Sequence, residues 1–241
     1  MAINNEEMEN KIEGLVDNIK SKFPNAGCIV LADFDQCIVR DHVSRLNTNY
    51  FSDNYPVNQE KLSYGKSGEG REQVRALCEL LIGLKVEVIK NSIRKLIGGT
   101  VLNPNGEPFL NICKKNKIPI VFVSCGLEWS VEELCRKHNL SGIFCIGDTF
   151  TEKNGIVTGV SGCLGAEDKG VVAKKFVERF PDRKIITVGH SAADRFLVEG
   201  GTAGYRVNLD SAGSLTNFEE NYDIVSVGLD WKPVTDMVQM G

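Results

Sequence analysis

Two carboxylates directly follow a short apolar run, and together they could bind a metal ion and a phosphate. Apolar residues 28–32 lead into Asp33, and Asp35 follows two positions later. Such a run is typical of a strand buried on both faces of a parallel sheet, and open α/β sheets bind ligands beyond the carboxyl ends of their strands. Two neighbouring acids repel each other there unless a cation is present. The alternative is a strand that ends in a polar turn, with Asp35 capping the next segment.

Three further polar features occur where strands end or helices begin. Ser124 follows the apolar run 118–123, and Lys169 lies at the start of an amphipathic segment. The sequence Gly-His-Ser-Ala-Ala-Asp at 189–194 follows a third apolar run, 184–188. A parallel sheet brings such strand ends to one edge, so we expect these side chains to lie near the acid pair.

The acid pair, the hydroxyl, the lysine and the acidic glycine turn resemble, in this order, the four motifs of the haloacid dehalogenase-like (HAD) superfamily. The resemblance is closest to the phosphoserine phosphatase-like branch and covers nearly the whole chain after residue 26. It implies a Rossmann-like, doubly wound, mostly parallel sheet with a small helical cap inserted after the first motif. It also implies metal-dependent hydrolysis of a small phosphomonoester through an aspartyl-phosphate intermediate.

The resemblance assigns catalytic roles to three residues. Asp33 is the expected nucleophile, and Asp35 the general acid that later acts as general base. Lys169 is expected to balance the negative charge of the transition state, the alternative being a solvated surface lysine. Dehalogenase chemistry is disfavoured, because those relatives do not need the second acid. A phosphotransferase that uses the same intermediate stays open.

The second motif is expected to bind the phosphoryl group. Ser124 would donate a hydrogen bond to its oxygens, and the backbone N–H groups of Cys125 and Gly126 would assist because they precede a helix start. A helix N-cap is the alternative role for Ser124, and the two roles are compatible.

The metal motif departs from the pattern of the family. The resemblance implies Mg²⁺ bound by the Asp33 carboxylate, the Asp35 backbone carbonyl and an aspartate where this chain has His190. A neutral imidazole is a poor ligand for Mg²⁺ but a good one for Mn²⁺, Fe²⁺ or Zn²⁺. Asp194 matches the second acid of the motif and could join the metal shell, while Cys37 replaces the usual threonine or serine. The rival interpretation is a catalytically impaired protein that binds a phosphorylated ligand or a protein partner.

A change of composition after the first motif marks the place where the resemblance implies a helical cap. Residues 42–66 are polar, and helical patterns follow at about 70–83 and 86–97. The Asn-Pro-Asn-Gly turn at 103–106 is a plausible return hinge. We therefore expect residues 42–104 to form a helical cap. Residues 1–41 and 105–241 are expected to form the α/β core. The alternative for the insertion is a long crossover that contains two helices.

Substrate specificity in this branch comes from the cap. Arg75 falls near the position where phosphoserine phosphatases bind the substrate carboxylate, a task that suits a guanidinium group. The alternative is an arginine on a helix surface. Asp41, His42 and Lys66 are further possible contacts without a supporting motif.

Strands alternate with helices in the remaining chain, which favours a doubly wound parallel sheet. The predicted helices and strands outside the insertion are a helix at 5–23, a helix at 107–116, a strand at 118–123, a helix at 128–138, a strand at 142–146, a hairpin around 155–160, a helix at 167–180, strands at 184–188, 205–208 and 224–227, and a closing helix at 231–239.

Composition limits the function classes. The 241 residues are 42% hydrophobic and 25% charged, with a net charge of -4 and no basic run, so nucleic acid is not an expected partner. An acidic start and no long apolar stretch argue against a signal peptide and a membrane partner. The eight cysteines are expected to be free core residues, without a CxxC pair to suggest zinc. We expect a cytoplasmic protein that acts on a small phosphorylated metabolite.

Overall fold

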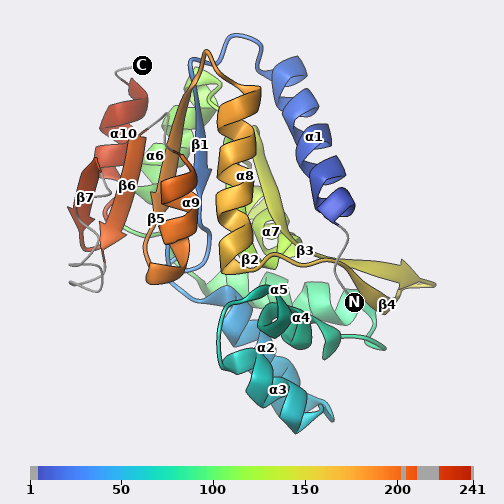
Figure 1. Cartoon of the computed structure of the whole chain (residues 1–241). Helices are drawn as coiled ribbons and strands as arrows, with labels where there is room; N and C mark the ends of the chain where they lie inside the picture. The colour runs from blue at the N-terminus through green and yellow to red at the C-terminus, as the bar shows by residue number, and fades with distance from the viewer. Residues whose placement is uncertain (1–4, 202–204, 211–222, 240–241) are drawn as a thin grey trace.

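The sheet is wound around β1, the strand that precedes the acid pair. The computed structural model describes residues 5–201, 205–210 and 223–239. Within these residues, seven strands form one sheet in the order β4-β3-β2-β1-β5-β6-β7 (Figure 1). Six strands run parallel, and β4 pairs antiparallel with β3. The strands are β1 (Cys28–Ala32), β2 (Ile120–Leu127), β3 (Ile143–Lys153), β4 (Ile156–Gly162), β5 (Lys184–Gly189), β6 (Tyr205–Asp210) and β7 (Ile224–Val227).

Helices cover both faces of the sheet, as a doubly wound fold requires. Figure 1 shows α1 (Asn5–Lys22), α8 (Ala166–Arg179) and α9 (Arg195–Gly200) in front of the sheet. Behind it lie α6 (Gly106–Asn116), α7 (Glu128–His138) and α10 (Lys232–Gln239). The predicted doubly wound, mostly parallel sheet is therefore confirmed.

Alternate residues of β1 enter two separate hydrophobic cores. Ile29 and Leu31 pack with the face that includes α1 and α8. Val30 and Ala32 pack with the face that includes α6, α7 and α10. Successive side chains of a strand point to opposite faces, so a strand covered on both sides must be apolar throughout. All five residues of β1 are buried, which explains the unbroken apolar run.

Four helices are inserted between β1 and α6, at the carboxyl ends of the parallel strands (Figure 1). They are α2 (Val43–Asn54), α3 (Gln59–Lys66), α4 (Arg71–Glu79) and α5 (Val86–Gly99). The two later helices were expected, but the polar stretch 42–66 also contains two. Its apolar pattern is weak because α2 buries only Val43, Asn47 and Phe51, and Asn47 accepts a hydrogen bond from Ser92 Oγ at 3.1 Å.

The insertion leaves and re-enters the core at one place. Val39 and Leu102 form an isolated antiparallel bridge. Beside it, the N–H of Arg40 donates to the carbonyl of Val101 at 2.8 Å. The amide of Asn103 donates to the carbonyl of Cys37 at 2.6 Å. These contacts join the two connecting segments into a short ribbon. The division of the chain into a core and a cap stays a prediction.

No helix in the described ranges combines the length and the apolar character that crossing a bilayer requires. All eight cysteines are free, as expected, and five of them are buried.

Candidate active site

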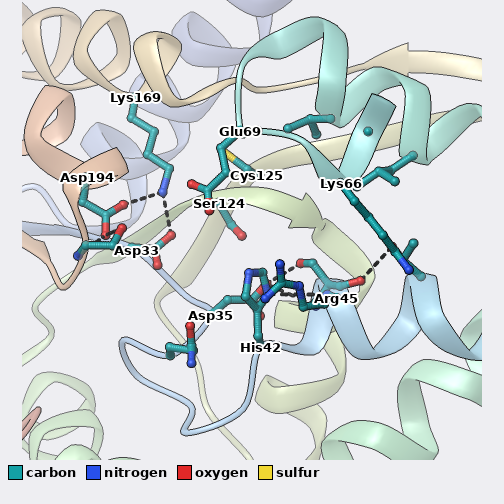
Figure 2. Close-up of a pocket in the computed structure, with 18 of the residues that line it drawn as sticks. Asp33, Asp35, His42, Arg45, Lys66, Glu69, Ser124, Cys125, Lys169 and Asp194 are labelled. Atoms are coloured by element: carbon teal, nitrogen blue, oxygen red, sulfur yellow. Dashed lines mark hydrogen bonds and ion pairs between the residues drawn. The ribbon is translucent and has the colours of Figure 1, made fainter. Parts of the chain in front are cut away.

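A cavity of about 390 Å³ lies between the carboxyl ends of the strands and the inserted helices (Figure 2). It brings together most of the residues that the sequence singles out. Its lining includes Asp33, Asp35, Ser124, Cys125, Lys169, His190 and Asp194 from the core, and His42, Ser44, Arg45, Lys66 and Glu69 from the insertion. Gly126 and Arg75 lie outside this lining.

Lys169 joins the first and last motifs at the bottom of the cavity. Its Nζ lies 2.7 Å from Asp33 Oδ1 and 2.6 Å from Asp194 Oδ1, and all three side chains are buried. Burial alone lowers the pKa of a lysine, but the charges of Asp194 and Asp33 outweigh it and raise the pKa of Lys169 well above its usual value. Lys169 is therefore a fixed cation that lies beside Asp33, and its catalytic role stays a prediction.

Asp194 is held by the turn that follows β5. Its Oδ2 accepts the backbone N–H groups of His190 and Ser191 at 3.0 and 3.1 Å, and the Ser191 hydroxyl at 3.0 Å. A Cβ atom on Gly189 would lie 2.4 Å from the Asp194 Cβ, so glycine permits this tight turn. Burial acts to raise the pKa of Asp194, but Lys169 and His190 together lower it. Asp194 is therefore ionised.

His190 lies between the two carboxylates. Its Nδ1 is 3.3 Å from Asp33 Oδ2 and 3.2 Å from Asp194 Oδ2. This nitrogen is buried but forms no hydrogen bond with either carboxylate oxygen. Burial favours the neutral imidazole, but the close Asp194 and Asp33 carboxylates raise the pKa of His190 well above its usual value. In the metal-free protein the side chain is thus an imidazolium that neutralises the acids.

The same groups fit a divalent metal ion. Each of Asp33, His190 and Asp194 offers a ligand atom, and these atoms lie within 4.8 Å of one another. The poorly satisfied Nδ1 of His190 also points to a ligand position at this place. Two carboxylates suit Mg²⁺, while an added imidazole suits Mn²⁺, Fe²⁺ or Zn²⁺. The donor set therefore fits an ion that accepts both oxygen and nitrogen.

Asp35 contacts the start of the insertion. Its two carboxylate oxygens accept the backbone N–H groups of Val43 at 3.0 Å and Ser44 at 3.1 Å, and the Ser44 hydroxyl donates as well. Asp35 thus caps the next segment, as the alternative interpretation held, and still lines the cavity. His42 Nδ1 lies 3.3 Å from Asp35 Oδ2. Burial acts to lower the pKa of His42, but the neighbouring Asp35 raises it above its usual value.

Ser124 lies within β2 rather than after it. The strand continues to Leu127, and α7 begins at Glu128 with Leu127 as its N-cap residue. The helix N-cap interpretation of Ser124 is therefore wrong, because the cap is Leu127, three positions further along the chain. The N–H of Gly126 donates to Ser124 Oγ at 3.1 Å. This hydrogen bond holds the Ser124 hydroxyl oxygen in place, and Ser124 lines the cavity.

Gly126 lets α2 approach the strand. A Cβ atom at this position would lie 2.1 Å from Ser44 Oγ and 3.3 Å from Ser124 Oγ. Ser44 is the residue whose N–H and hydroxyl bind Asp35. The missing side chain at Gly126 therefore helps to set the contact between Asp35 and the insertion.

The insertion supplies charged residues that no motif indicated. Arg45 of α2 and Lys66 of α3 line the cavity opposite Asp33 and Lys169, and Glu69 lines it beside Ser124 (Figure 2). Arg75 instead pairs with Glu79 on its own helix, with an Nε–Oε1 distance of 3.1 Å. Only the general presence of cations at the start of a helical insertion could have pointed to Arg45. Lys66 and His42 were named as possible contacts and do line the cavity.

An ion pair between Arg71 and Asp168 joins α4 to α8. Arg71 Nε donates to Asp168 Oδ2 at 2.8 Å, and Nη2 donates to Oδ1. The same carboxylate accepts the N–H of Gly165 at 2.8 Å, at the start of α8. Asp168 is buried and directly precedes Lys169. This contact therefore holds the insertion against the helix that carries the site lysine.

Comparisons with known proteins support the fold. No family model and no curated protein matches this sequence. Among solved structures, a substrate-bound phosphoserine phosphatase matches with a TM-score of 0.64 and 17% identity, covering 88% of this chain and 99% of that one. Cytosolic 5'-nucleotidase IIIB bound to cytidine matches with a TM-score of 0.66 and 14% identity, covering 99% and 91%.

A phosphoserine phosphatase from T. onnurineus in complex with NDSB-201 matches with a TM-score of 0.59 and 17% identity, covering 89% of this chain and 95% of that one. These matches span most of each chain. The chain therefore has the HAD fold of the phosphoserine phosphatase type, which confirms the expected resemblance at the level of the fold.

Proposed function

We propose that this protein is a metal-dependent phosphatase that hydrolyses a small phosphomonoester through an aspartyl-phosphate on Asp33. The contact between Lys169 Nζ and Asp33 Oδ1, at 2.7 Å, is the observation that carries the proposal. It places a buried cation against a buried carboxylate at the bottom of a cavity. An ionised carboxylate can attack phosphorus, whereas a protonated one cannot.

In the first step an oxygen of Asp33 attacks phosphorus, and the bond from phosphorus to the substrate oxygen breaks. Asp35, which lines the same cavity, protonates that departing oxygen. Lys169 stays beside Asp33, and Ser124 donates its hydroxyl hydrogen to a phosphoryl oxygen. These fixed donors stabilise charge that develops in the transition state without having to reorganise.

In the second step water attacks phosphorus while Asp35 takes a proton from it, and the bond between Asp33 and phosphorus breaks. Inorganic phosphate leaves and the free carboxylate returns. Transfer to an acceptor alcohol instead of water would make the protein a phosphotransferase. The hydrogen bonds from Val43 and Ser44 to Asp35 position it for both proton transfers.

Asp33, Asp194, His190 and the backbone carbonyl of Asp35 would hold the metal ion. When bound, Mg²⁺ or Mn²⁺ supplies positive charge between the nucleophile and the phosphate, which reduces their repulsion. Binding requires the proton on His190 to leave if its imidazole is to be a ligand. We therefore expect Mn²⁺ to support activity better than Mg²⁺.

The substrate is a small phosphorylated metabolite. A volume of about 390 Å³ lies within the range of small-molecule sites. Arg45 and Lys66, on the side opposite Asp33, suit a substrate with a second anionic group, and Glu69 suits an amine or a hydroxyl. Residues 42–104 would act as the cap that closes over this substrate and excludes water, with the ribbon at Val39 and Leu102 as its hinge. We place this activity in the cytoplasm.

One observation favours a second candidate, a non-catalytic protein that binds a phosphorylated ligand or a protein partner. The imidazolium of His190 neutralises Asp33 and Asp194 without a metal ion. A site whose charges are already balanced can keep its fold and bind a phosphate without needing the cofactor.

A phosphatase screen separates the two candidates. The protein is assayed for released phosphate over a panel of phosphorylated metabolites, with Mg²⁺, with Mn²⁺ and without metal, beside the near-isosteric variant Asp33→Asn. The phosphatase predicts metal-dependent turnover that the variant lacks. Saturable binding of a phosphorylated compound without turnover in any metal would overturn it in favour of the second candidate.

A further inference from the structure

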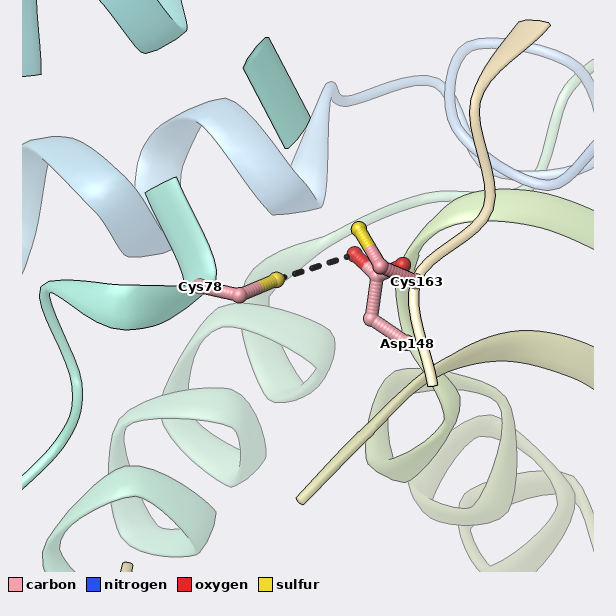
Figure 3. Close-up of side chains that lie close together, drawn as sticks. All are labelled: Cys78, Asp148 and Cys163. Carbon is pink, nitrogen blue, oxygen red and sulfur yellow. Dashed lines mark hydrogen bonds between the residues drawn. The ribbon is translucent and has the colours of Figure 1, made fainter. Parts of the chain in front are cut away.

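A second cluster of metal-ligating side chains lies away from the cavity. It consists of Cys78 on α4, Asp148 on β3 and Cys163 between β4 and α8 (Figure 3). All three residues are buried. They are far apart in the sequence and fit no common zinc-binding spacing, so the fold alone assembles them.

The contacts within the cluster centre on the Asp148 carboxylate. Cys78 Sγ donates to Asp148 Oδ2 at 3.2 Å, and the N–H of Leu164 donates to Oδ1 at 3.0 Å. Within the described part of the chain, no lysine, arginine or histidine forms an ion pair with this carboxylate, although only 3% of the residue is exposed. A buried carboxylate without a cation is costly, and a bound metal ion would remove that cost.

We propose that Cys78, Asp148 and Cys163 form a zinc site. Two sulfurs and one carboxylate oxygen are ligands that Zn²⁺ prefers. Their atoms lie within 4.8 Å of one another. A tetrahedral zinc ion at 2.3 Å from sulfur keeps its ligand atoms roughly 3.5–3.8 Å apart, so only a small contraction is needed. As the two Zn–S bonds form, each thiol releases its proton to solvent.

A backbone oxygen beside Cys163 would complete a set of four donors. The backbone carbonyl of Arg71 accepts from Cys163 Sγ at 3.7 Å. A closed set of four ligands is typical of structural rather than catalytic zinc. Zinc here would connect α4 of the insertion to β3 and to the segment before α8. It would therefore reinforce the junction that the Arg71–Asp168 ion pair also forms. This inference does not depend on the phosphatase proposal.

Cobalt titration tests the site, because Co²⁺ replaces zinc and reports its ligands by absorption. Full-length, metal-free protein is titrated with Co²⁺ in a phosphine reductant. We expect one equivalent to give a thiolate-to-cobalt charge-transfer band in the near ultraviolet with tetrahedral ligand-field bands, and Zn²⁺ to abolish both. Metal at Asp33, His190 and Asp194 gives no thiolate band, so the variant Asp33→Asn should show the same spectrum.

The matched variants are Cys78→Ser and Cys163→Ser, with Cys135→Ser as the control thiol on α7. Each ligand variant should lose about half of the thiolate band at saturation, because one of two thiolates remains, and bind at least about tenfold more weakly, while the control matches the wild type. Asp148→Asn, which keeps both thiols, should keep a band of weaker affinity and serves if a serine variant does not fold. Absence of a thiolate band in the reduced wild type, or a full band in Cys78→Ser or Cys163→Ser, would overturn the proposal.

Discussion

His190 Nδ1 lies 3.3 Å from Asp33 Oδ2, so a histidine stands beside the carboxylate that we propose as the nucleophile. Lys169 contacts the other oxygen of the same carboxylate. In the metal-free protein, two cations thus face Asp33 and Asp194. A metal ion that binds to His190 would have to replace the proton on its imidazole, so we expect this histidine to influence the metal affinity.

Replacing His190 with aspartate should change the metal preference. His190→Asp removes a cation and adds a carboxylate beside two others, so the metal-free variant should unfold at a lower temperature than the wild type. It should bind Mg²⁺ at least about tenfold more tightly. Isothermal titration with Mg²⁺ and Mn²⁺ measures both affinities, and His190→Asn controls for loss of the imidazole. Wild-type protein that already binds Mg²⁺ as tightly as His190→Asp would refute this account of His190.

The charge of His190 should make metal-free stability depend on pH. Burial lowers the pKa of His190, but the two carboxylates raise it above the value of about 6.5 in the unfolded chain. The protonated imidazole therefore contributes its full stabilisation below about pH 6.5, and this is lost as the pH rises towards the folded pKa. The free energy of unfolding should fall with pH above neutrality, by up to about 1.4 kcal/mol per pH unit.

Urea unfolding in a chelator from pH 6 to 9 measures this slope. The variant His190→Asn carries no titrating proton at this position. Its free energy of unfolding should therefore fall less steeply with pH than that of the wild type, by the contribution of one proton. Equal slopes for the two proteins would show that His190 is neutral in the folded state.

The ion pair between Arg71 and Asp168 should hold the insertion to the core. A double-mutant cycle with Arg71→Gln and Asp168→Asn should give a coupling energy of about 1–3 kcal/mol in unfolding, because Asp168 is buried and two hydrogen bonds join it to the partly buried Arg71. The exposed pair Lys232–Asp236 is a matched control and should show little coupling. Additive effects of Arg71→Gln and Asp168→Asn would mean that the contact does not stabilise the junction.

The sequence predicted the core well because its strands are buried on both faces. The run at 28–32 is apolar throughout, and its alternate residues enter two hydrophobic cores. Glycine, proline and asparagine between elements marked most of the boundaries. The end of β2 was predicted too early, because Ser124, Cys125 and Gly126 look like a turn. In the structure the strand continues to Leu127, which pairs with Asp148 of β3.

The site was predictable where polar residues follow the end of a strand, directly as Asp33 does after β1 or in the next turn as Asp194 does after β5. The residues of the insertion were not predictable in the same way. Arg45 and Glu69 reach the cavity because helices pack in one particular arrangement, and no local pattern encodes it. The polar residues of α2 concealed its helical period, since Asn47 is buried and pairs with Ser92. Cys78, Asp148 and Cys163 meet only through the tertiary fold.

Trapping the covalent intermediate tests the central claim most directly. The protein is incubated with Mn²⁺ and radiolabelled acetyl phosphate, quenched in acid and reduced with borohydride, which converts an aspartyl-phosphate to homoserine. We predict acid-stable label on the wild type and homoserine at position 33 by mass spectrometry, with neither in Asp33→Asn. Metal-dependent phosphate release by the wild type without label or homoserine at position 33 would contradict the proposed mechanism.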